Sequence, residues 1–146
     1  KTKQSVDKLL KEEASRGLQV LKTYYNFRER VNNIKDDLLK FLIEKKRSGK
    51  KVMAYGAAAK GNTLLNYMGV KTDLIPYVYD AAKSKQNQFM PGSHIPILSP
   101  EHLPKINPDF ILILPWNIAD EVKSQNSWAT KKGIKFVIAI PKLVIS

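Results

Sequence analysis

Apolar side chains in the first third of the chain recur three or four positions apart, or near multiples of that spacing. This pattern predicts a helix over residues 1–48 with one apolar stripe and a charged opposite face. Gly17 interrupts the pattern at a cost of about 1 kcal/mol relative to alanine, and can divide the region into a short helix and a long one. Gly49 suits the left-handed position that follows a helix end. The stripe consists of Leu18, Leu21, Tyr25, Val31, Ile34, Leu38 and Phe41.

Beyond residue 50 the pattern changes to short apolar runs separated by helical and polar stretches. Runs of this length are typical of buried strands in a parallel sheet. Pro76 has no N–H to donate, so we expect pairing of its strand to start late. Strands that alternate with helices predict an α/β fold with a mainly parallel sheet flanked by helices. The predicted strands are 52–55, 74–79, 110–114 and 135–140, with an extended piece at 94–97; the predicted helices are 63–68, closed by Gly69, and 118–132, closed by Gly133, with a further helix start at 99–101.

A chain of 146 residues with 43% hydrophobic residues is long enough for one domain with its own core. We expect a helical segment over 1–49 that packs on or leads into an α/β domain over 50–146. The chain has no cysteine, which excludes disulfide scaffolds and cysteine-based zinc sites and fits a cytoplasmic protein. It also has no apolar run of the roughly 18 residues that a membrane span needs. Because it begins without Met or a signal sequence, we expect a piece of a longer protein.

The formal net charge of +12 favours anionic partners, which include nucleic acid, acidic membranes and phosphorylated small molecules. Most lysines are scattered along the predicted helices, where they can simply solvate the outer faces. They are not interleaved with aromatic residues as in a platform that binds single strands. The charge pattern therefore disfavours nucleic acid as the partner.

The stretch 56–63 joins a predicted strand to a predicted helix. Free backbone N–H groups and the helix dipole make such a point an anion site, and small side chains let the backbone approach a ligand. Lys60 can add a mobile positive charge, and Asn62 or Thr63 can cap the helix or donate a hydrogen bond. The alternative is a tight turn whose small residues serve strand–helix packing.

This loop departs from two known phosphate-binding patterns. Ala58 stands where G-x-G-x-x-G has its second glycine. Gly56 and Gly61 are spaced as in a Walker loop, but Asn62 replaces the lysine that follows the second glycine there, and Lys60 precedes that glycine. The departures exclude a nucleotide-hydrolysing P-loop.

Other strand ends carry further candidates. Asp80 lies about 20 residues beyond the loop, as a ribose-binding acid does, but a turn or helix-cap role fits equally. Trp116 can stack on a base or sugar, or belong to the core, and Asn117 can cap the next helix or bind a ligand. His94 lies in a constrained loop and can contact substrate. The sequence shows no cluster with metal-ligand spacing and no catalytic constellation.

Several stretches in this order and spacing resemble the C-terminal domain of S-adenosylmethionine (SAM)-dependent sugar C-methyltransferases, over roughly residues 10–140. Two departures are Ala81-Ala82, where the family has a more polar pair, and Asn87, where glycine is common. The stretches that carry the resemblance are Tyr55-Gly56-Ala57-Ala58-Ala59-Lys60-Gly61-Asn62-Thr63-Leu64-Leu65-Asn66, Tyr77-Val78-Tyr79-Asp80, Lys85-Gln86, Met90-Pro91-Gly92-Ser93-His94-Ile95-Pro96-Ile97, and Pro108-Asp109-Phe110-Ile111-Leu112-Ile113-Leu114-Pro115-Trp116-Asn117 with Glu121.

The resemblance implies a Rossmann-like domain from a three-part enzyme that methylates a carbon of a nucleotide-linked keto-deoxysugar. A zinc-binding module and a SAM-binding domain, which carries the catalytic base, would precede this part. The resemblance implies that this chain holds the nucleotide sugar, needs the missing methyltransferase domain as its partner, binds no cofactor itself and is inactive alone. SAM and a structural zinc are expected in the missing N-terminal domains.

The substrate-binding residues implied are the loop, with Lys60 and the loop amides on the diphosphate, and the residues at the other strand ends. An NAD- or CoA-binding Rossmann domain is the first alternative, and a basic module for nucleic acid is the second. No catalytic residue, sugar, base or methylated carbon is assigned. The full set of implied substrate-binding residues is Gly56, Ala57, Ala58, Ala59, Lys60, Gly61, Asn62, Thr63, Asp80, His94, Trp116 and Asn117.

Overall fold

The computed structural model describes residues 2–146, which form two compact units, one ending at Asn33 and the other taking the rest of the chain. The first unit contains α1 (Thr2–Ser15) and the beginning of α2 (Leu21–Arg47). Gly17 lies in the turn between these helices with a φ of 71°, and Thr23 Oγ1 donates to its carbonyl at 2.8 Å. The predicted division of the helical region at Gly17 is confirmed.

The apolar stripe of the helical region has two different environments. In the first unit, Leu21 and Tyr25 are exposed, whereas in the second unit Leu38 and Phe41 are buried. The Phe41 ring meets the Phe110 ring edge-on, with centroids 5.3 Å apart. The last turns of α2 therefore belong to the core of the second unit. The boundary between the units lies inside α2, after Asn33. The boundary predicted from the sequence, between the helical segment and the α/β domain, lies after residue 49.

The second unit is built on a six-stranded sheet with the order β3-β2-β1-β4-β5-β6. The first five strands pair in parallel, and β6 runs antiparallel to β5. The predicted α/β fold with a mainly parallel, Rossmann-like sheet is confirmed. The sequence pattern does not predict β6. The strands are β1 (Val52–Tyr55), β2 (Val78–Tyr79), β3 (Ile97–Leu98), β4 (Phe110–Ile113), β5 (Lys135–Ile138) and β6 (Val144–Ile145).

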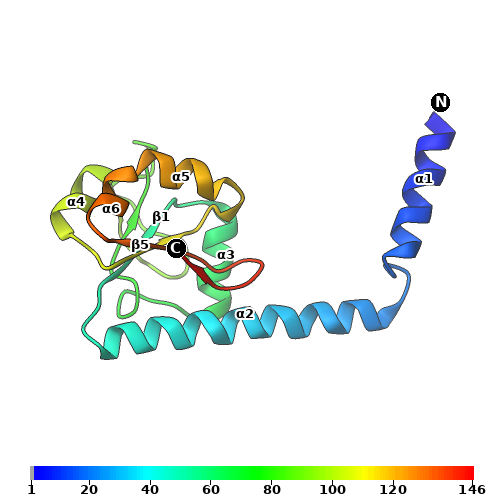
Figure 1. Ribbon diagram of the computed structural model, residues 1–146, viewed down its shortest axis with the longest axis horizontal. Coiled ribbons are helices and arrows are strands. Elements are labelled where there is room, and N and C mark those ends of the chain that lie inside the picture. The colour runs from blue at the N-terminus through cyan, green and yellow to red at the C-terminus, as the bar shows by residue number, and fades with distance from the viewer. Residues whose placement is uncertain (1) are drawn as a thin grey trace. The chain divides into compact units, whose positions relative to one another are not determined.

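Helices cover both faces of this sheet (Figure 1). Alternate residues of β1 point to opposite faces, so Ala54 joins one core and Met53 the other. The first core includes the end of α2 and α3, and the second includes α4, α5 and α6. The remaining helical elements are α3 (Ala59–Met68), η1 (Pro100–His102), α4 (Leu103–Ile106), η2 (Trp116–Ile118), α5 (Ala119–Gln125) and α6 (Ser127–Lys131).

Most predicted elements are present, with shifted boundaries. The helix predicted over 63–68 ends as expected at Gly69, with a φ of 69°, but begins four residues earlier. The helix predicted over 118–132 is divided at Asn126, whose buried side chain donates to the Val122 carbonyl at 2.9 Å. The strand predicted over 74–79 pairs only at its last two residues, as Pro76 requires.

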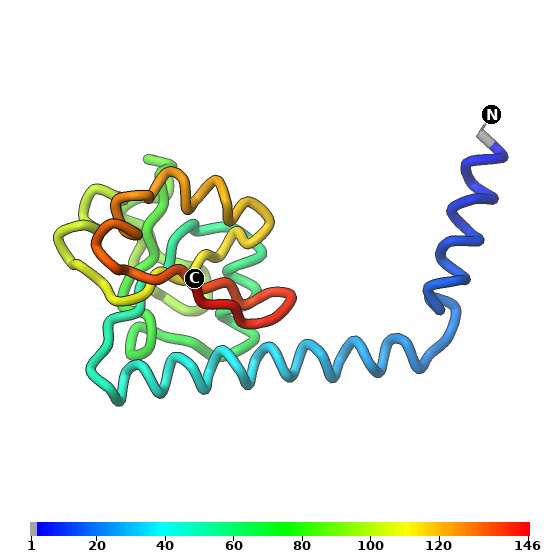
Figure 2. The backbone as a smooth tube through the Cα atoms, viewed as in Figure 1, coloured from blue at the N-terminus to red at the C-terminus, as the bar shows by residue number. Residues whose placement is uncertain are grey.

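The chain between β2 and β3 has no regular secondary structure and runs as an irregular green path in Figure 2. Near its end, this segment folds back on itself, and Phe89 forms an isolated antiparallel bridge with Pro96. Within the described residues, none of the helices is both long enough and apolar enough to cross a membrane.

Candidate functional site

The carboxyl ends of the parallel strands meet at one edge of the sheet. Tyr55 at the end of β1 is in register with Tyr79 of β2 and Ile113 of β4. The strand order reverses between β1 and β4, which is where open α/β sheets bind ligands. The structure thus brings most predicted site residues to this carboxyl edge, while His94 comes from the irregular segment. Those at the edge are Gly56, Ala57, Ala58, Ala59, Lys60, Gly61, Asn62, Thr63, Asp80, Trp116 and Asn117.

Two glycines of the loop are required by packing inside the protein. Gly56 has a φ of 88°, and its N–H donates to the Tyr79 carbonyl at 2.7 Å. A Cβ atom on Gly56 would lie 2.5 Å from Pro115 Cδ, and one on Gly61 would lie 2.5 Å from Leu114 Cβ. These glycines therefore let the loop and α3 approach the chain that follows β4. The packing interpretation of the small residues holds for both positions.

The N-terminus of α3 is open. The helix begins at Ala59, and the residue before it makes no capping side-chain hydrogen bond. Thr63 Oγ1 donates to the Ala59 carbonyl at 3.2 Å, and Asn62 Oδ1 accepts from Asn66 Nδ2 at 3.3 Å. The predicted caps are therefore wrong. Within residues 2–146 no acceptor is recorded for the N–H groups of residues 59–61, so these amides and the helix dipole can serve an anion.

The carboxylate of Asp80 holds the loop in place. It is buried, with 8% of the residue exposed. One oxygen accepts the N–H of Ala57 at 2.7 Å, and the other accepts the N–H of Ala82 at 2.8 Å. Lys85 Nζ lies 3.2 Å from the oxygen that Ala57 uses. These contacts fit the turn interpretation of Asp80, because a ribose hydroxyl would have to share the carboxylate with three donors.

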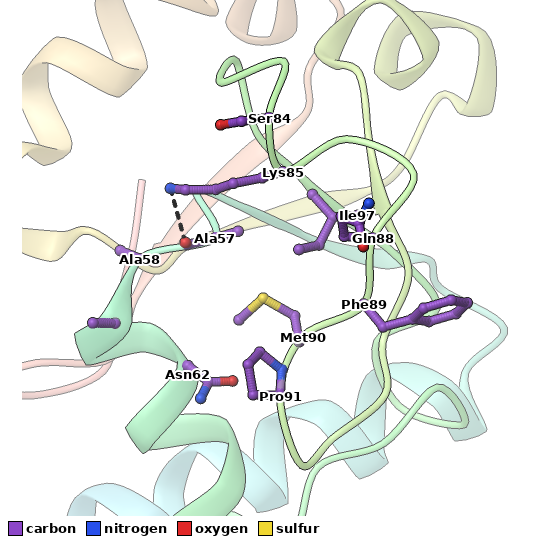
Figure 3. A pocket seen from close by; sticks show the side chains of 11 residues that line it. Ala57, Ala58, Asn62, Ser84, Lys85, Gln88, Phe89, Met90, Pro91 and Ile97 are labelled. Carbon is purple, nitrogen blue, oxygen red and sulfur yellow. Dashed lines mark hydrogen bonds between the residues drawn. The ribbon is translucent and has the colours of Figure 1, made fainter.

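A cavity of about 570 Å³ lies beside this loop (Figure 3). Its size falls in the range of small-molecule sites. The loop and the first turn of α3 form one wall, and the irregular segment after β2 forms the other. The sequence pattern does not predict the second wall. The signal that could have indicated it is an apolar pair, Phe89-Met90, inside a polar stretch. The lining residues are Ala57, Ala58, Ala59 and Asn62 on the first wall and Ser84, Lys85, Gln88, Phe89, Met90, Pro91 and Ile97 on the second.

The second wall is held by contacts with α3 and the turn after it. Asn66 Nδ2 donates to the Pro91 carbonyl at 2.9 Å, and Lys71 Nζ donates to the Gly92 carbonyl at 2.6 Å. Gly92 has a φ of 77°, and a Cβ there would collide with the Asn66 side chain. The wall is therefore fixed by residues that are some 20 positions away in the sequence.

Backbone pairing with β3 completes this wall. Asn87 donates its N–H to the Ile97 carbonyl at 2.8 Å, and the Ile97 N–H donates to the Gln88 carbonyl at 2.8 Å. Asn87 has a φ of 63°, a conformation that glycine adopts without strain and asparagine tolerates. Either asparagine or glycine therefore suits this position.

A smaller cavity of about 230 Å³ lies on the other side of the loop, between the ends of β1 and β2 and helix α5. Its lining includes Tyr55, Pro115 and Val122. Ala58 and Lys85 line both cavities. The loop after β1 and the Lys85 side chain therefore separate two spaces at the carboxyl edge.

Lys60, Trp116 and Asn117 lie outside the lining of both cavities. Lys60 Nζ is 5.9 Å from the centroid of the Trp116 ring. Trp116 is half-buried at the start of η2, so it belongs to neither buried core. Asn117 is exposed, and no side chain caps α5. Lys60 and Trp116 form a cation–aromatic pair at the rim of the carboxyl edge, outside both cavities.

The histidines are on the surface of the second unit. His94 has a φ of 57°, and its N–H donates to the Met90 carbonyl at 2.9 Å. Its side chain is exposed and lines neither cavity. His102 Nδ1 lies 3.3 Å from the Ser99 carbonyl. Across residues 2–146, no three His, Cys, Asp or Glu side chains come together in a way that could hold a metal ion.

Tyr79 is a fully buried residue at the end of β2. Burial, and to a lesser extent the charge of Tyr77, raises the pKa of Tyr79 to about 12. Its buried hydroxyl has no hydrogen-bond partner in the described part of the chain. It belongs to the core on the α5 side of the sheet, so it stays protonated at neutral pH.

Sequence comparison relates the chain to known proteins. The model of the family described as "C-methyltransferase C-terminal domain" matches residues 1–141. C-methyltransferase NovU from Streptomyces niveus is 32% identical over 138 residues, which make up 94% of this chain and 33% of NovU. The chain thus spans about a third of the length of this relative.

Among solved structures, UDP-D-quinovosamine 4-dehydrogenase from Vibrio fischeri matches with a TM-score of 0.48 and 24% identity, over 64% of this chain and 79% of that one. The family match spans both units of the structure and the whole carboxyl edge. The chain belongs to the C-methyltransferase C-terminal domain family.

Proposed function

We propose that this chain is the substrate-binding part of a SAM-dependent C-methyltransferase and that it holds a nucleotide-linked keto-deoxysugar at the carboxyl edge of the sheet. One observation carries the proposal. In a member of the C-methyltransferase C-terminal domain family, a cavity of about 570 Å³ opens beside the uncapped N-terminus of α3. A space of this size suits a small molecule, and an uncapped helix start suits its phosphates.

The electrostatics of the edge support a diphosphate ligand. Three amides at the start of α3 lack an acceptor within residues 2–146, and each can donate to a phosphate oxygen. Ala58 and Ala59 carry no side chain that would keep a ligand from this backbone. The net charge of +12 adds long-range attraction for an anion. The apolar side chains of Met90 and Ile97 offer a surface for a base or a deoxysugar.

This chain would contribute position and charge to the reaction. In the proposed reaction, a proton leaves a carbon next to the ketone and the resulting enolate takes a methyl group from SAM. The catalytic base, the SAM site and a structural zinc are proposed for other parts of the protein. The residues present here do not suit zinc, because the chain has no cysteine and its described part has no three-residue ligand cluster. On this proposal, the chain alone does not transfer methyl groups.

The proposed partners follow from the same function. They are the nucleotide sugar and the methyltransferase domain that supplies SAM. The lysines do not form an aromatic-lined platform in the sequence, so nucleic acid is not among the proposed partners. A cytoplasmic location stays a prediction from the sequence.

Isothermal titration calorimetry with a panel of ligands tests the proposal. The panel consists of UDP-glucose, dTDP-glucose, GDP-mannose, NAD, coenzyme A and a single-stranded oligonucleotide at low salt. We expect saturable binding of at least one nucleotide sugar and none of NAD or coenzyme A. Binding of NAD or coenzyme A alone would replace the proposal with a dinucleotide- or CoA-binding domain. Oligonucleotide binding that falls steeply with salt would replace it with a nucleic-acid module.

A further inference from the structure

The position of Lys85 distinguishes it from every other lysine near the carboxyl edge. It lies in the irregular segment after β2, and its side chain reaches across the top of the larger cavity to the loop after β1 (Figure 3). Its Nζ donates to the Ala57 carbonyl at 3.1 Å and to an Asp80 carboxylate oxygen at 3.2 Å. Lys85 also lines the smaller cavity on the far side of the loop.

The ammonium of Lys85 has a donor to spare. A lysine ammonium has three N–H donors, and the protein accepts two of them. No third acceptor is recorded among residues 2–146. The side chain of Lys85 is 45% exposed, whereas that of Asp80 is 11% exposed. A ligand that enters from solvent therefore meets the ammonium before it meets the carboxylate.

Lys60, the cation that the sequence places in the loop, lies elsewhere. Its Nζ is 5.9 Å from the centre of the Trp116 ring, and it lines neither cavity. Lys83, two residues before Lys85, is exposed and also lines neither cavity. These two lysines carry the same charge as Lys85 but are not at the boundary between the two spaces.

We propose that Lys85, and not Lys60, is the cation that contacts the phosphate oxygens of the ligand in the larger cavity. This inference rests on the proposed binding of a nucleotide sugar, and it names the lysine that binds the diphosphate of that ligand. The third N–H of Lys85 donates to a phosphate oxygen, while the other two keep the ammonium on the Ala57 carbonyl and Asp80. Lys60 stays with Trp116 at the rim.

Calorimetry with matched charge-removing variants tests this assignment. The probes are the sugar nucleotide that binds tightest among UDP-glucose, dTDP-glucose and GDP-mannose, its nucleoside diphosphate and its free nucleoside. Lys85→Gln removes the charge but keeps one donor for the Ala57 carbonyl. We expect it to weaken binding of the diphosphate about tenfold, the value of one hydrogen bond to a charged group. Nucleoside affinity should change by less than about twofold, and Lys85→Arg should restore most of the loss.

Lys60→Gln and Lys83→Gln are the matched controls, since each removes one positive charge close to the cavity. Both should keep the diphosphate affinity within about threefold, as expected for charges at the rim. A measurement on the wild-type chain avoids any folding defect of the variants. With ¹³C-labelled lysine, the Cε signal of Lys85 should shift more than those of Lys60 and Lys83 when the diphosphate is added.

The outcomes separate this inference from the proposed function. A wild-type chain that binds none of the three nucleotide sugars overturns both. If the wild type binds but Lys85→Gln keeps its diphosphate affinity, the role of Lys85 is wrong and the proposed function stands. An equal loss for diphosphate and nucleoside also overturns it, because Lys85 then acts only by holding the loop. A loss confined to Lys60→Gln would return the contact to Lys60.

Discussion

The two edges of the sheet use the same kind of contact in different surroundings. At the carboxyl edge, Asp80 accepts the N–H of Ala57 and the ammonium of Lys85. At the amino edge, Asp109 accepts the N–H of Lys51 at 2.8 Å and the ammonium of Lys50 at 2.9 Å. Each aspartate thus ties the strand it flanks, β2 or β4, to one end of the central strand β1.

The surroundings of the two aspartates differ. Asp80 is buried beside a loop of small residues, and its partner Lys85 lines two cavities. The side chain of Asp109 is 33% exposed, and both lysines beside it are exposed. An aspartate clamp, in which one carboxylate accepts a backbone N–H and a lysine ammonium, therefore serves to join strands. A cavity of about 330 Å³ lies beside Asp109 as well. What points to a ligand at the carboxyl edge is a cavity of about 570 Å³ next to an open helix start.

The largest expected effect comes from filling the space at Gly61. In Gly61→Val, the new side chain collides with Leu114, where even a Cβ atom would lie 2.5 Å from the Leu114 Cβ. We expect the free energy of unfolding to fall by about 3 kcal/mol, measured by urea denaturation. Thr63→Val places the same side chain on an exposed position of α3 and should change stability by about 0.5 kcal/mol or less. Equal losses in the two variants would contradict the packing role of Gly61.

The next largest effect is expected at the carboxyl-edge aspartate. Asp80→Asn replaces one acceptor oxygen by an NH₂ group, so a partly buried hydrogen bond from the N–H of Ala57 or of Ala82 is lost. Stability should fall by about 2 kcal/mol. Asp73→Asn is the control, because Asp73 pairs with Lys46 at an exposed position and should cost about 0.5 kcal/mol or less. A neutral Asp80→Asn variant would show that the clamp does not hold the loop.

A smaller, pH-dependent effect is expected at the amino edge. The N–H of Lys51 is the largest influence on the pKa of Asp109 and lowers it. Burial opposes this effect, and the hydrogen bond and charge of Lys50 together with the charge of Lys51 add to the lowering, so the pKa lies below its usual value. A lowered folded-state pKa adds stability above the pKa of the unfolded chain and loses it as the pH falls through the folded-state pKa.

Asp109→Asn should therefore cost about 1 kcal/mol or less at pH 7. Urea denaturation of both proteins from pH 7 to pH 3 measures the difference, which should shrink toward zero at the acidic end. A difference that grows on acidification would contradict the clamp at Asp109.

The smallest expected effect is at the rim. Lys60→Met removes an exposed cation from the Trp116 ring and should change the free energy of unfolding by about 0.5 kcal/mol or less. Thermal denaturation of the variant and the wild type provides the comparison. A loss of more than about 2 kcal/mol would show that Lys60 has a structural role that its position does not indicate.

The carboxyl edge was largely predictable from local sequence signals. Five apolar residues at 110–114 and the glycine after Met68 are enough to place β4 and the end of α3. The start of α3 was misplaced because Asn62 and Thr63 match capping residues, whereas the preceding alanines and Lys60 favour helix intrinsically. Because the helix begins before Asn62 and Thr63, these residues do not cap it and its start stays open.

The second wall of the cavity was not predictable in the same way. Its shape depends on hydrogen bonds from Asn66 to Pro91 and from Lys71 to Gly92, which join residues more than 20 positions apart. No local pattern encodes such pairs. For the same reason, Lys85 was one lysine among many in the sequence, and its place between two cavities became visible only in the fold.

A titration followed by ¹H–¹⁵N NMR tests the central claim, that the carboxyl edge binds a nucleotide sugar, most directly. The ¹⁵N-labelled chain is titrated with the nucleotide sugar that binds tightest by calorimetry. We predict that the largest shifts fall on the amides of residues 57–62 and 84–90, in the two walls of the larger cavity, while the signals of Lys50, Lys51 and Asp109 at the amino edge do not move. Shifts centred on the amino edge, or spread evenly over the chain, would contradict the account.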